Sequence, residues 1–574
     1  MQPLYFRPPY DIDEEPETDD QAAPIVSIQN QGYIVIGSKI DTDDWNERPR
    51  KSPAEITESV LNQLQIMKGK PQFRGSVILM HDGGGDRSAT VAALPVLIDS
   101  LRAHGFTIVP VSALMGKTTA EVMPRLTFTQ YLRALPDSLA FSGVQLVGRF
   151  IVYVFFLGDV LMGARLLLIG ILAIIDRLRK PHGNASPGYN PRVAVLIPAY
   201  NEETVIVRTI RSVLNSDYKN LRIIVIDDGS PDRTVEVARE AYAAEIAAGH
   251  IEVLTKQNGG KAAALNYALG SLTEEIYVGI DADTVIATDA ISKLIPHFED
   301  PRIGAMAGNA KVGNRVNLWT RWQALEYITS QNFERRALDL FHVVTVVPGA
   351  IGAWRTAPVK AAGGYPINTV AEDADLTMNI LEQGFRVDYE DRSLAFTEAP
   401  IDMKGLMRQR FRWSFGTLQA IWKHRAAFVR NKAMGLFALP NILIFQMFLP
   451  LVSPFIDMMF LYGVANYFID RHYHPLSAST ASLDKLLVFF LGFLVIDFAT
   501  SSVAFSLERR HPANKGDGWL LFHIWLQRFA YRQVFSIVLF KTLKRAIDGK
   551  PFNWDKIERT AKMSKATDAI TETT

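Results

Sequence analysis

Two carboxylates with the spacing of a metal site, Asp281 and Asp283, directly follow the apolar stretch Ile276–Ile280. Carboxylates on alternate residues can hold a hard divalent cation that also binds phosphate oxygens. The same spacing recurs at Asp11/Asp13, Asp41/Asp43 and Asp373/Asp375. Only the pair at 281 and 283 stands where a buried strand is expected to end. The alternative for a single pair is an aspartate that caps a turn.

Polar residues also stand at the ends of the neighbouring elements. Asp227 and Asp228 follow another apolar stretch, and Lys261 opens a helix after two glycines. Glu372 and Asp373 lie in the acidic first turn of a further helix. Because acids or glycines end four successive strands at nucleotide-binding positions, we favour a nucleotide site over isolated turn caps.

A basic stretch at 403–432 has eight Lys and Arg and no acid. It contains Gln409, Arg412 and Trp413. Arg412 could contact a diphosphate bidentately, and Trp413 could stack on a sugar ring. The alternative is that Arg410 and Arg412 are ordinary anchors for lipid headgroups.

The elements that must position these residues alternate between strands and helices. Strands are expected at Val193–Pro198, Leu221–Ile226, Ile251–Leu254 and Ile276–Ile280. Helices are expected over about 205–214, 232–247 and 262–269. Continuous Val/Ile strands with helical crossovers indicate a mostly parallel sheet covered on both faces. In such sheets, ligands bind at the carboxyl ends of the strands, where the acidic residues fall.

The composition is an average of unlike parts. Mean hydropathy is +0.06 although 21% of the residues are charged. Four stretches are long and apolar enough to cross a bilayer, which takes about 20 residues. They run over about 150–172, 441–469, 485–506 and 519–540. The last carries Arg528 and Arg532, so part of it could lie along the interface or face the protein. The alternative, buried core helices, is disfavoured by their number.

Basic flanks predict the orientation of these spans. Arg177, Arg179, Lys180 and Arg192 follow the first stretch, and the basic run precedes the later ones. The positive-inside rule therefore puts the middle section in the cytoplasm and residues 1–140 outside. The basic C-terminus also favours the inside, which requires an even number of crossings after residue 432. Because three candidate spans follow residue 432, the sequence does not decide whether the number of crossings there is even or odd.

The order of these motifs, followed by apolar spans, resembles the processive inverting family 2 glycosyltransferases. That group includes the synthases of cellulose, chitin, hyaluronan and poly-N-acetylglucosamine, and the resemblance covers about 190–560. It implies a GT-A fold that uses a UDP-sugar. It also implies the following roles by position: Asp228, with Asp227 nearby, and Lys261 at the nucleotide; Asp281 and Asp283 on Mg²⁺ or Mn²⁺; Glu372 beside the nucleotide-sugar; Asp373 as general base; and Gln409, Arg412 and Trp413 at the diphosphate and acceptor.

Three motifs in residues 1–140 resemble the later motifs of NodB-like polysaccharide deacetylases. They contain Arg7, Asp43 and His81, and a helix over Ala89–His104 and a strand over Phe106–Pro110 fit the end of that barrel. The family's metal ligands come from earlier motifs, and none lies ahead of residue 6. We therefore expect an inactive, partial (β/α) segment. An unrelated small α/β domain is the alternative.

The chain is thus expected to be a multi-pass enzyme of the plasma or inner membrane. It is expected to polymerise UDP-N-acetylglucosamine into a β-linked polysaccharide and to export it, with possible accessory export or deacetylase proteins. The alternatives are a non-processive transferase that makes a polyprenyl-phosphate sugar and a non-catalytic membrane scaffold. The absence of cysteine excludes thiol chemistry, and a net charge of +1 argues against a nucleic-acid partner.

The expected organisation has five parts. They are a deacetylase-like segment at 1–125, a transmembrane region at 145–176, a GT-A domain at 190–430, transmembrane and interfacial helices at 433–545, and a cytoplasmic tail at 546–574.

Overall fold

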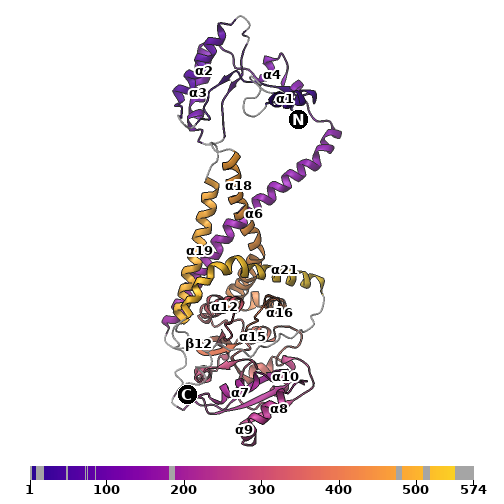
Figure 1. Cartoon of the computed structure of the whole chain (residues 1–574), viewed down its shortest axis with the longest axis vertical. Coiled ribbons are helices and arrows are strands. Elements are labelled where there is room, and N and C mark those ends of the chain that lie inside the picture. Colours follow the sequence, from indigo (N-terminus) through magenta and orange to yellow (C-terminus); the bar gives the residue numbers. More distant parts are fainter. Residues whose placement is uncertain are drawn as a thin grey trace. The chain divides into compact units, whose positions relative to one another are not determined.

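The fold is described from a computed structural model of the chain (Figure 1). It describes residues 3–7, 19–46, 50–70, 73, 75–83, 86–179, 186, 188–473, 481–508 and 517–549. Most of the expected tail at 546–574 lies outside these residues. The chain divides into two compact units, residues 1–149 with 470–478, and residues 150–469 with 479–574.

The larger unit contains an eight-stranded sheet in the order β7-β6-β5-β8-β11-β10-β12-β9. The strands are β5 (Val193–Ala199), β6 (Leu221–Asp227), β7 (Ile251–Thr255), β8 (Ile276–Gly279), β9 (Val285–Ile286), β10 (Ile303–Val312), β11 (Gly352–Arg355) and β12 (Arg386–Thr397). β7, β6, β5 and β8 are parallel, β11 is antiparallel to both of its neighbours, and β10 pairs with β12 in parallel. The four predicted strands and the mostly parallel sheet are confirmed.

Apolar layers cover both faces of this sheet. Along β5, Ala194 and Leu196 belong to one core cluster, and Val193, Val195 and Ile197 belong to the other. This division follows from the two-residue period of a strand. The helices are α7 (Ile206–Leu214), α8 (Thr234–Ala241), α9 (Ala243–Ala247), α10 (Lys261–Ser271), α11 (Ala290–Leu294), α12 (Leu318–Glu326), η3 (Tyr327–Asn332), α13 (Phe333–Asp339), α14 (Thr356–Ala361), α15 (Glu372–Glu382), α16 (Met403–Lys423) and α17 (Ala427–Arg430). The expected helix over 232–247 is divided at Tyr242.

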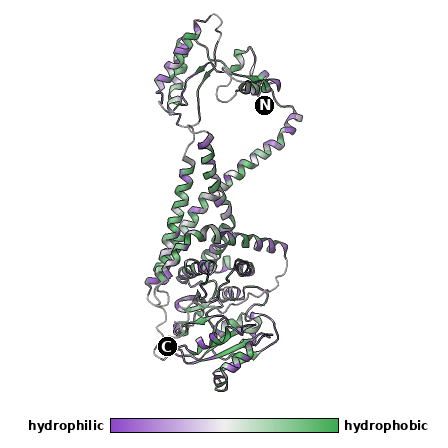
Figure 2. Ribbon diagram, in the orientation of Figure 1, coloured by the Kyte–Doolittle hydropathy of each residue, from purple (hydrophilic) through white to green (hydrophobic). Residues whose placement is uncertain are grey.

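In the part of the chain that the structure describes, three helical stretches are long and apolar enough to cross a membrane: Phe156–Leu178, Met434–Ile469 and Leu483–Glu508. They lie in α6 (Phe128–Leu178), in η4 (Met434–Ala438), η5 (Asn441–Phe448) and α18 (Leu449–Tyr473), and in α19 (Ala481–Glu508). Hydrophobic residues predominate along α18 and α19 (Figure 2). Three of the four predicted spans are therefore matched by helices.

The fourth stretch, 519–540, does not form one helix that could cross a membrane, and the alternative drawn from its arginines, that part of it faces the protein, is confirmed. This stretch is broken into η7 (Asp517–His523), α20 (Ile524–Leu526), η8 (Gln527–Tyr531) and α21 (Arg532–Asp548). α21 packs against α16 and buries one face through Val534, Val538 and Leu539. Charged and polar residues within this stretch, such as Gln527, Arg532 and Gln533, make it less apolar than a membrane span.

A buried ionic cluster joins the end of α19 to the sheet. Glu508 is 4% exposed and contacts Lys311 of β10, Arg336 of α13 and Asn309. Lys311 and Arg336 are 1% and 2% exposed, and Arg336 also contacts Asp391. A buried carboxylate that compensates two buried cations cannot be neutralised without leaving charge unpaired.

Replacing Glu508 with glutamine is therefore expected to lower the free energy of unfolding by about 3–5 kcal/mol. The measurement is thermal unfolding of the full chain in detergent. Glu275→Gln is the matched control, because Glu275 pairs with Arg355 while its side chain is 60% exposed. Exposed pairs contribute at most about 1 kcal/mol. Equal unfolding midpoints for the two variants would contradict the prediction.

The smaller unit contains two parallel strand pairs, β1 (Tyr5–Phe6) with β2 (Ile34–Val35) and β3 (Ile40–Asp41) with β4 (Ile78–Leu79). Its helices are α1 (Asp19–Asn30), α2 (Pro53–Lys68), α3 (Ser88–Ala103), α4 (Val111–Leu114) and α5 (Thr119–Val122). α3 confirms the helix expected over 89–104. The strand expected over 106–110 is wrong, because these residues pair with no strand among those the structure describes.

Candidate functional site

A cavity of about 840 Å³ opens at the carboxyl edge of the sheet. The sequence-predicted residues that line it are Asp228, Lys261, Asp281, Asp283, Glu372, Asp373, Gln409, Arg412 and Trp413. Residues of all three candidate spans also line it, among them Arg165, Gln446 and Asp497. One continuous space therefore joins the predicted nucleotide positions to the apolar helices.

The two aspartates after β6 have different local environments. Asp227 accepts hydrogen bonds from the backbone N–H groups of Gly229 and Ser230, which shapes the turn, and it is not among the cavity-lining residues. Asp228 lines the cavity and accepts from Lys256 Nζ at 2.7 Å and from the backbone N–H of Gly260 at 2.6 Å. Asp228 thereby fixes the glycine loop that begins α10.

Lys261, at the start of α10, lies among carboxylates. Its Nζ is 2.5 Å from Asp281 Oδ1 and 3.5 Å from Glu372 Oε1. Burial opposes its charge, but Asp281, Glu372 and Asp373 together raise the pKa of Lys261 above its ordinary value. Lys261 therefore stays protonated and offsets the negative charge of the site.

Asp281 and Asp283 suit a hard divalent ion by their chemistry and position. Both line the cavity after β8, and Asp283 is buried beside the hydroxyls of Thr284 and Thr397. Mg²⁺ is commonly held by one or two carboxylates together with substrate phosphates. The donor set is therefore sufficient for an ion that a bound diphosphate shares.

Asp373 lies in the first turn of α15 and points its carboxylate into the cavity, where Oδ1 accepts from the backbone N–H of Ala374 at 2.8 Å. Burial, and next the negative charge of Glu372, raise the pKa of Asp373 to about 6. A carboxylate with a pKa near neutrality is suited to accepting a proton from a substrate hydroxyl.

A pH dependence follows from this raised pKa. If deprotonated Asp373 is the active form, kcat/KM is expected to fall about tenfold per pH unit below about pH 6. Glu372→Gln removes a charge that raises this pKa, so the acid limb should move to lower pH. Initial rates of UDP release over about pH 5–8 measure the acid limb of the wild type and that of the Glu372→Gln variant. An acid limb that is unchanged in Glu372→Gln would contradict the assignment.

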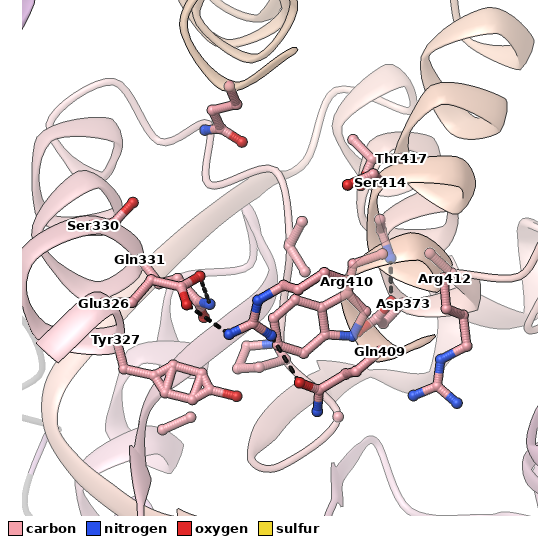
Figure 3. Close-up of a pocket in the computed structure, with 18 of the residues that line it drawn as sticks. Glu326, Tyr327, Ser330, Gln331, Asp373, Gln409, Arg410, Arg412, Ser414 and Thr417 are labelled. Carbon is pink, nitrogen blue, oxygen red and sulfur yellow. Dashed lines mark hydrogen bonds and ion pairs between the residues drawn. The ribbon is translucent and has the colours of Figure 1, made fainter. Parts of the chain in front are cut away.

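Arg410 and Arg412 point in different directions from α16 (Figure 3). Arg410 is 2% exposed and donates to Glu326 at 2.6 Å and to Gln409 at 2.8 Å. Its guanidinium also lies 4.2 Å from the ring centroid of Trp413. Arg410 is therefore no lipid anchor, because it holds Gln409 and Trp413 in place.

The ring centroids of Trp413 and Tyr327 are 6.4 Å apart.

In the smaller unit, the polar residues form a separate cluster. His81 Nδ1 lies 2.8 Å from Asp44 Oδ1, and Asp41 completes a group that could hold a metal ion. Burial raises the pKa of Asp44, but hydrogen bonds from His81, Thr42 and Thr90 outweigh it and hold that pKa below its ordinary value. The predicted Asp43 pairs instead with Lys51 at 3.4 Å. Arg7 directly follows β1 and is exposed.

A mostly parallel sheet with acids after β6 and β8 and a lysine opening α10 is the arrangement of a nucleotide-sugar transferase of the GT-A type. The family model described as "Glycosyltransferase like family 2" matches residues 191–416. These residues form a domain of the family 2 glycosyltransferase type.

The chain is related to poly-beta-1,6-N-acetyl-D-glucosamine synthases. It is 27% identical to that of Staphylococcus aureus strain COL over 270 residues, which are 47% of this chain and 64% of the relative. It is 28% identical to that of Staphylococcus epidermidis over 249 residues, 43% of this chain and 60% of the relative. The chain thus spans less than two thirds of the length of these relatives.

Two solved structures are more distant. One is the mannosyltransferase PcManGT from Pyrobaculum calidifontis in complex with GDP-Man and Mn²⁺, with a TM-score of 0.45, 18% identity, and coverage of 71% of this chain and 99% of that one. The other is S. aureus TarS, with a TM-score of 0.30, 17% identity, and coverage of 44% and 43%.

Proposed function

We propose that the chain is a membrane-embedded inverting glycosyltransferase that polymerises a UDP-sugar into a β-linked polysaccharide and exports it. The observation that carries this proposal is the single cavity lined both by Asp281, Asp283 and Asp373 and by residues of all three candidate spans. UDP-N-acetylglucosamine is the favoured donor, because the relatives are named as synthases of an N-acetylglucosamine polymer.

In the proposed reaction, the acceptor hydroxyl attacks the anomeric carbon from the face opposite the diphosphate, which inverts the configuration. Asp373 takes the hydroxyl proton, and UDP leaves. Lys261 and Arg412 would hold the diphosphate, Asp228 with Asp227 would order the nucleotide loop, and Glu372 would keep Lys261 in place. Gln409 and Trp413 would hold the acceptor end.

Asp281 and Asp283 would bind Mg²⁺ or Mn²⁺. When bound, such an ion supplies positive charge next to the diphosphate oxygens. Asp283 is buried and Asp281 is held by Lys261, so both carboxylates are ordered in place before substrate binds.

The helices support a defined orientation. Among the residues that the structure describes, two candidate spans follow residue 432, an even number, so the chain would return to the side on which the transferase domain lies. Basic residues flank that domain, which favours the cytoplasm and places the N-terminal segment outside. The proposed location is the plasma or inner membrane, with the bilayer, the UDP-sugar and the growing polymer as partners.

The test is incubation of the purified full chain in detergent with Mg²⁺ or Mn²⁺ and a panel of UDP-sugars. UDP release and the length of the product on a gel are then measured. A long polymer supports the proposal, whereas a single transfer to a polyprenyl phosphate supports a non-processive enzyme. No UDP release from any donor would favour a non-catalytic scaffold.

For the N-terminal segment, we propose a deacetylase-like remnant without hydrolase activity. The support is the resemblance of its three motifs to the later motifs of that family alone; among the described residues, Asp41, Asp44 and His81 are the group that could hold a metal ion. Metal-dependent release of acetate from an N-acetylglucosamine oligomer by the chain would overturn this proposal.

A further inference from the structure

The corner between α16 and the second candidate span exposes large apolar side chains. α16 ends at Lys423, α17 covers Ala427–Arg430, and the candidate span begins at Met434. Within this corner, the side chains of Trp422 and Val429 are 72% and 88% exposed. Tryptophan is enriched where a membrane meets water, because its ring is apolar and its N–H is polar. The corner therefore has the composition of a surface that lies at the edge of a bilayer.

Three cations share this corner. Arg425, Arg430 and Lys432 are exposed and form no ion pair among the residues that the structure describes. The Arg425 guanidinium lies 5.1 Å from the ring centroid of Trp422 and donates to the backbone carbonyl of the same residue at 2.9 Å. The chain has no acid from residue 403 to residue 456. Apolar surface and uncompensated positive charge are thus combined in one place.

The corner is held in shape by contacts on its inner side. His424 directly follows α16 and is 4% exposed, and its two ring nitrogens lie 2.8 Å from Asp375 and 2.7 Å from Glu382 of α15. A Cβ at Gly435 would lie 2.4 Å from the backbone oxygen of Phe428, so the first turn of the candidate span packs directly on α17. α17 is therefore fixed between the transferase domain and the span, with its outer side free to meet a ligand.

We propose that this corner binds the headgroups of anionic phospholipids in the bilayer that the neighbouring span crosses. Trp422 and Val429 would enter the interfacial layer, and the three cations would contact lipid phosphates. The inference goes beyond the proposed reaction, but it rests on the proposed placement of Met434–Ile469 in a membrane. The residues of this lipid corner are Trp422, Arg425, Val429, Arg430 and Lys432.

An anionic bilayer suits the lipid corner better than a soluble acidic partner does. Lys432 stands two residues before the candidate span, so the chain itself brings the corner to the membrane surface. Basic residues next to a spanning helix are attracted to the negative cytoplasmic leaflet, and this attraction acts only within about a Debye length. A soluble acidic partner would have to compete with that surface for the same cations. Lys423 adds little, because Asp375 already pairs with it at 2.9 Å.

The test uses the fact that the chain has no cysteine, so one introduced cysteine is the only thiol to label. Val429→Cys carries a nitroxide, and the full chain is reconstituted into vesicles of phosphatidylcholine alone or mixed with phosphatidylglycerol. Collisions of the nitroxide with a water-soluble nickel complex and with oxygen, which concentrates in the bilayer, are compared. In the anionic vesicles the label is expected to be shielded from the nickel complex. In the neutral vesicles this shielding should be lost.

A charge variant tests the role of the cations. With Arg425, Arg430 and Lys432 all replaced by glutamine, the label at Val429 is expected to lose its shielding in the anionic vesicles. The matched control removes the same amount of charge from exposed positions before β6 and at α8, which lies at the end of the transferase domain away from α18 and α19 (Figure 1). Shielding should persist in this control, which replaces Lys219, Arg233 and Arg239 with glutamine.

Two outcomes would overturn the inference. Equal shielding in neutral and anionic vesicles would mean that apolar contact alone explains it. A label that is exposed in both would leave this surface to a protein partner or to water. Leu461→Cys in α18 tests the underlying placement separately, because Leu461 is 65% exposed within the candidate span. A label in water at Leu461 defeats the proposed membrane placement, whereas a label in lipid there with an exposed label at Val429 defeats only this inference.

Discussion

Replacing Asp373 with asparagine is expected to lower transfer to the acceptor by about 10²- to 10⁴-fold, the contribution usual for a positioned general base. Asparagine has nearly the same shape and can still accept the backbone N–H bond of Ala374. It cannot take a proton from the attacking hydroxyl. The loss should therefore appear in kcat, while UDP-sugar binding changes little.

Initial-rate polymer synthesis and equilibrium binding of the UDP-sugar separate these two effects. Asp217→Asn is the control, because Asp217 is outside the cavity and its side chain accepts a hydrogen bond from the Ser292 hydroxyl. Polymer synthesis by Asp373→Asn at the wild-type rate would remove Asp373 from the mechanism. Loss of donor binding would instead assign it to the nucleotide-sugar site.

Glu372 is the other candidate for the general base, and its surroundings make it the weaker candidate. Its carboxylate lies 3.5 Å from Lys261 Nζ, so a cation that stays protonated stabilises its charged form. Asp373 carries no ion pair of its own among the described residues, and burial raises its pKa. The two adjacent acids therefore differ in their surroundings, and Asp373 is the one without a paired cation among the described residues.

Local pattern predicted the first half of the sheet well. β5, β6, β7 and β8 are short Val/Ile stretches between amphipathic helices, and their periodicity is visible in the sequence. β10 and β12 were not predicted. β10 contains Gly304, Ala305, Gly308 and Asn309, and β12 contains five charged residues, so neither has the composition of a buried strand. They pair over long sequence separations that no local pattern encodes.

The residues of the candidate site also fall into those that the sequence pattern predicts and those that it does not. Asp281 and Asp373 could be found because they stand at element ends, where spacing has a geometric meaning. The partner of Arg410 could not be found in this way. Arg410 meets Glu326 across 84 residues, and its burial depends on α12 packing against α16. From spacing alone it looked like part of a basic, lipid-facing run.

Removing the divalent ion is the second large effect that we expect. Chelation with EDTA should abolish UDP release, and Asp283→Asn should raise the metal concentration for half-maximal rate by at least about 10–100-fold. Changes to residues that only support metal ligands already have effects of that size, and Asp283 would be a ligand itself. Its carboxylate meets two threonine hydroxyls, so an amide should fit without unfolding the loop.

Chromatographic separation of UDP from UDP-sugar is the suitable assay, because it requires no coupling enzyme that itself depends on Mg²⁺. Lys261 allows the experiment to separate an effect of EDTA on stability from an effect on catalysis. Lys261 Nζ lies 2.5 Å from Asp281 and compensates part of the negative charge of the site, so the chain should stay folded in EDTA. An unchanged unfolding midpoint together with lost activity would locate the effect in catalysis. Full UDP release in EDTA would mean that Lys261 and Arg412 stabilise the diphosphate without a metal.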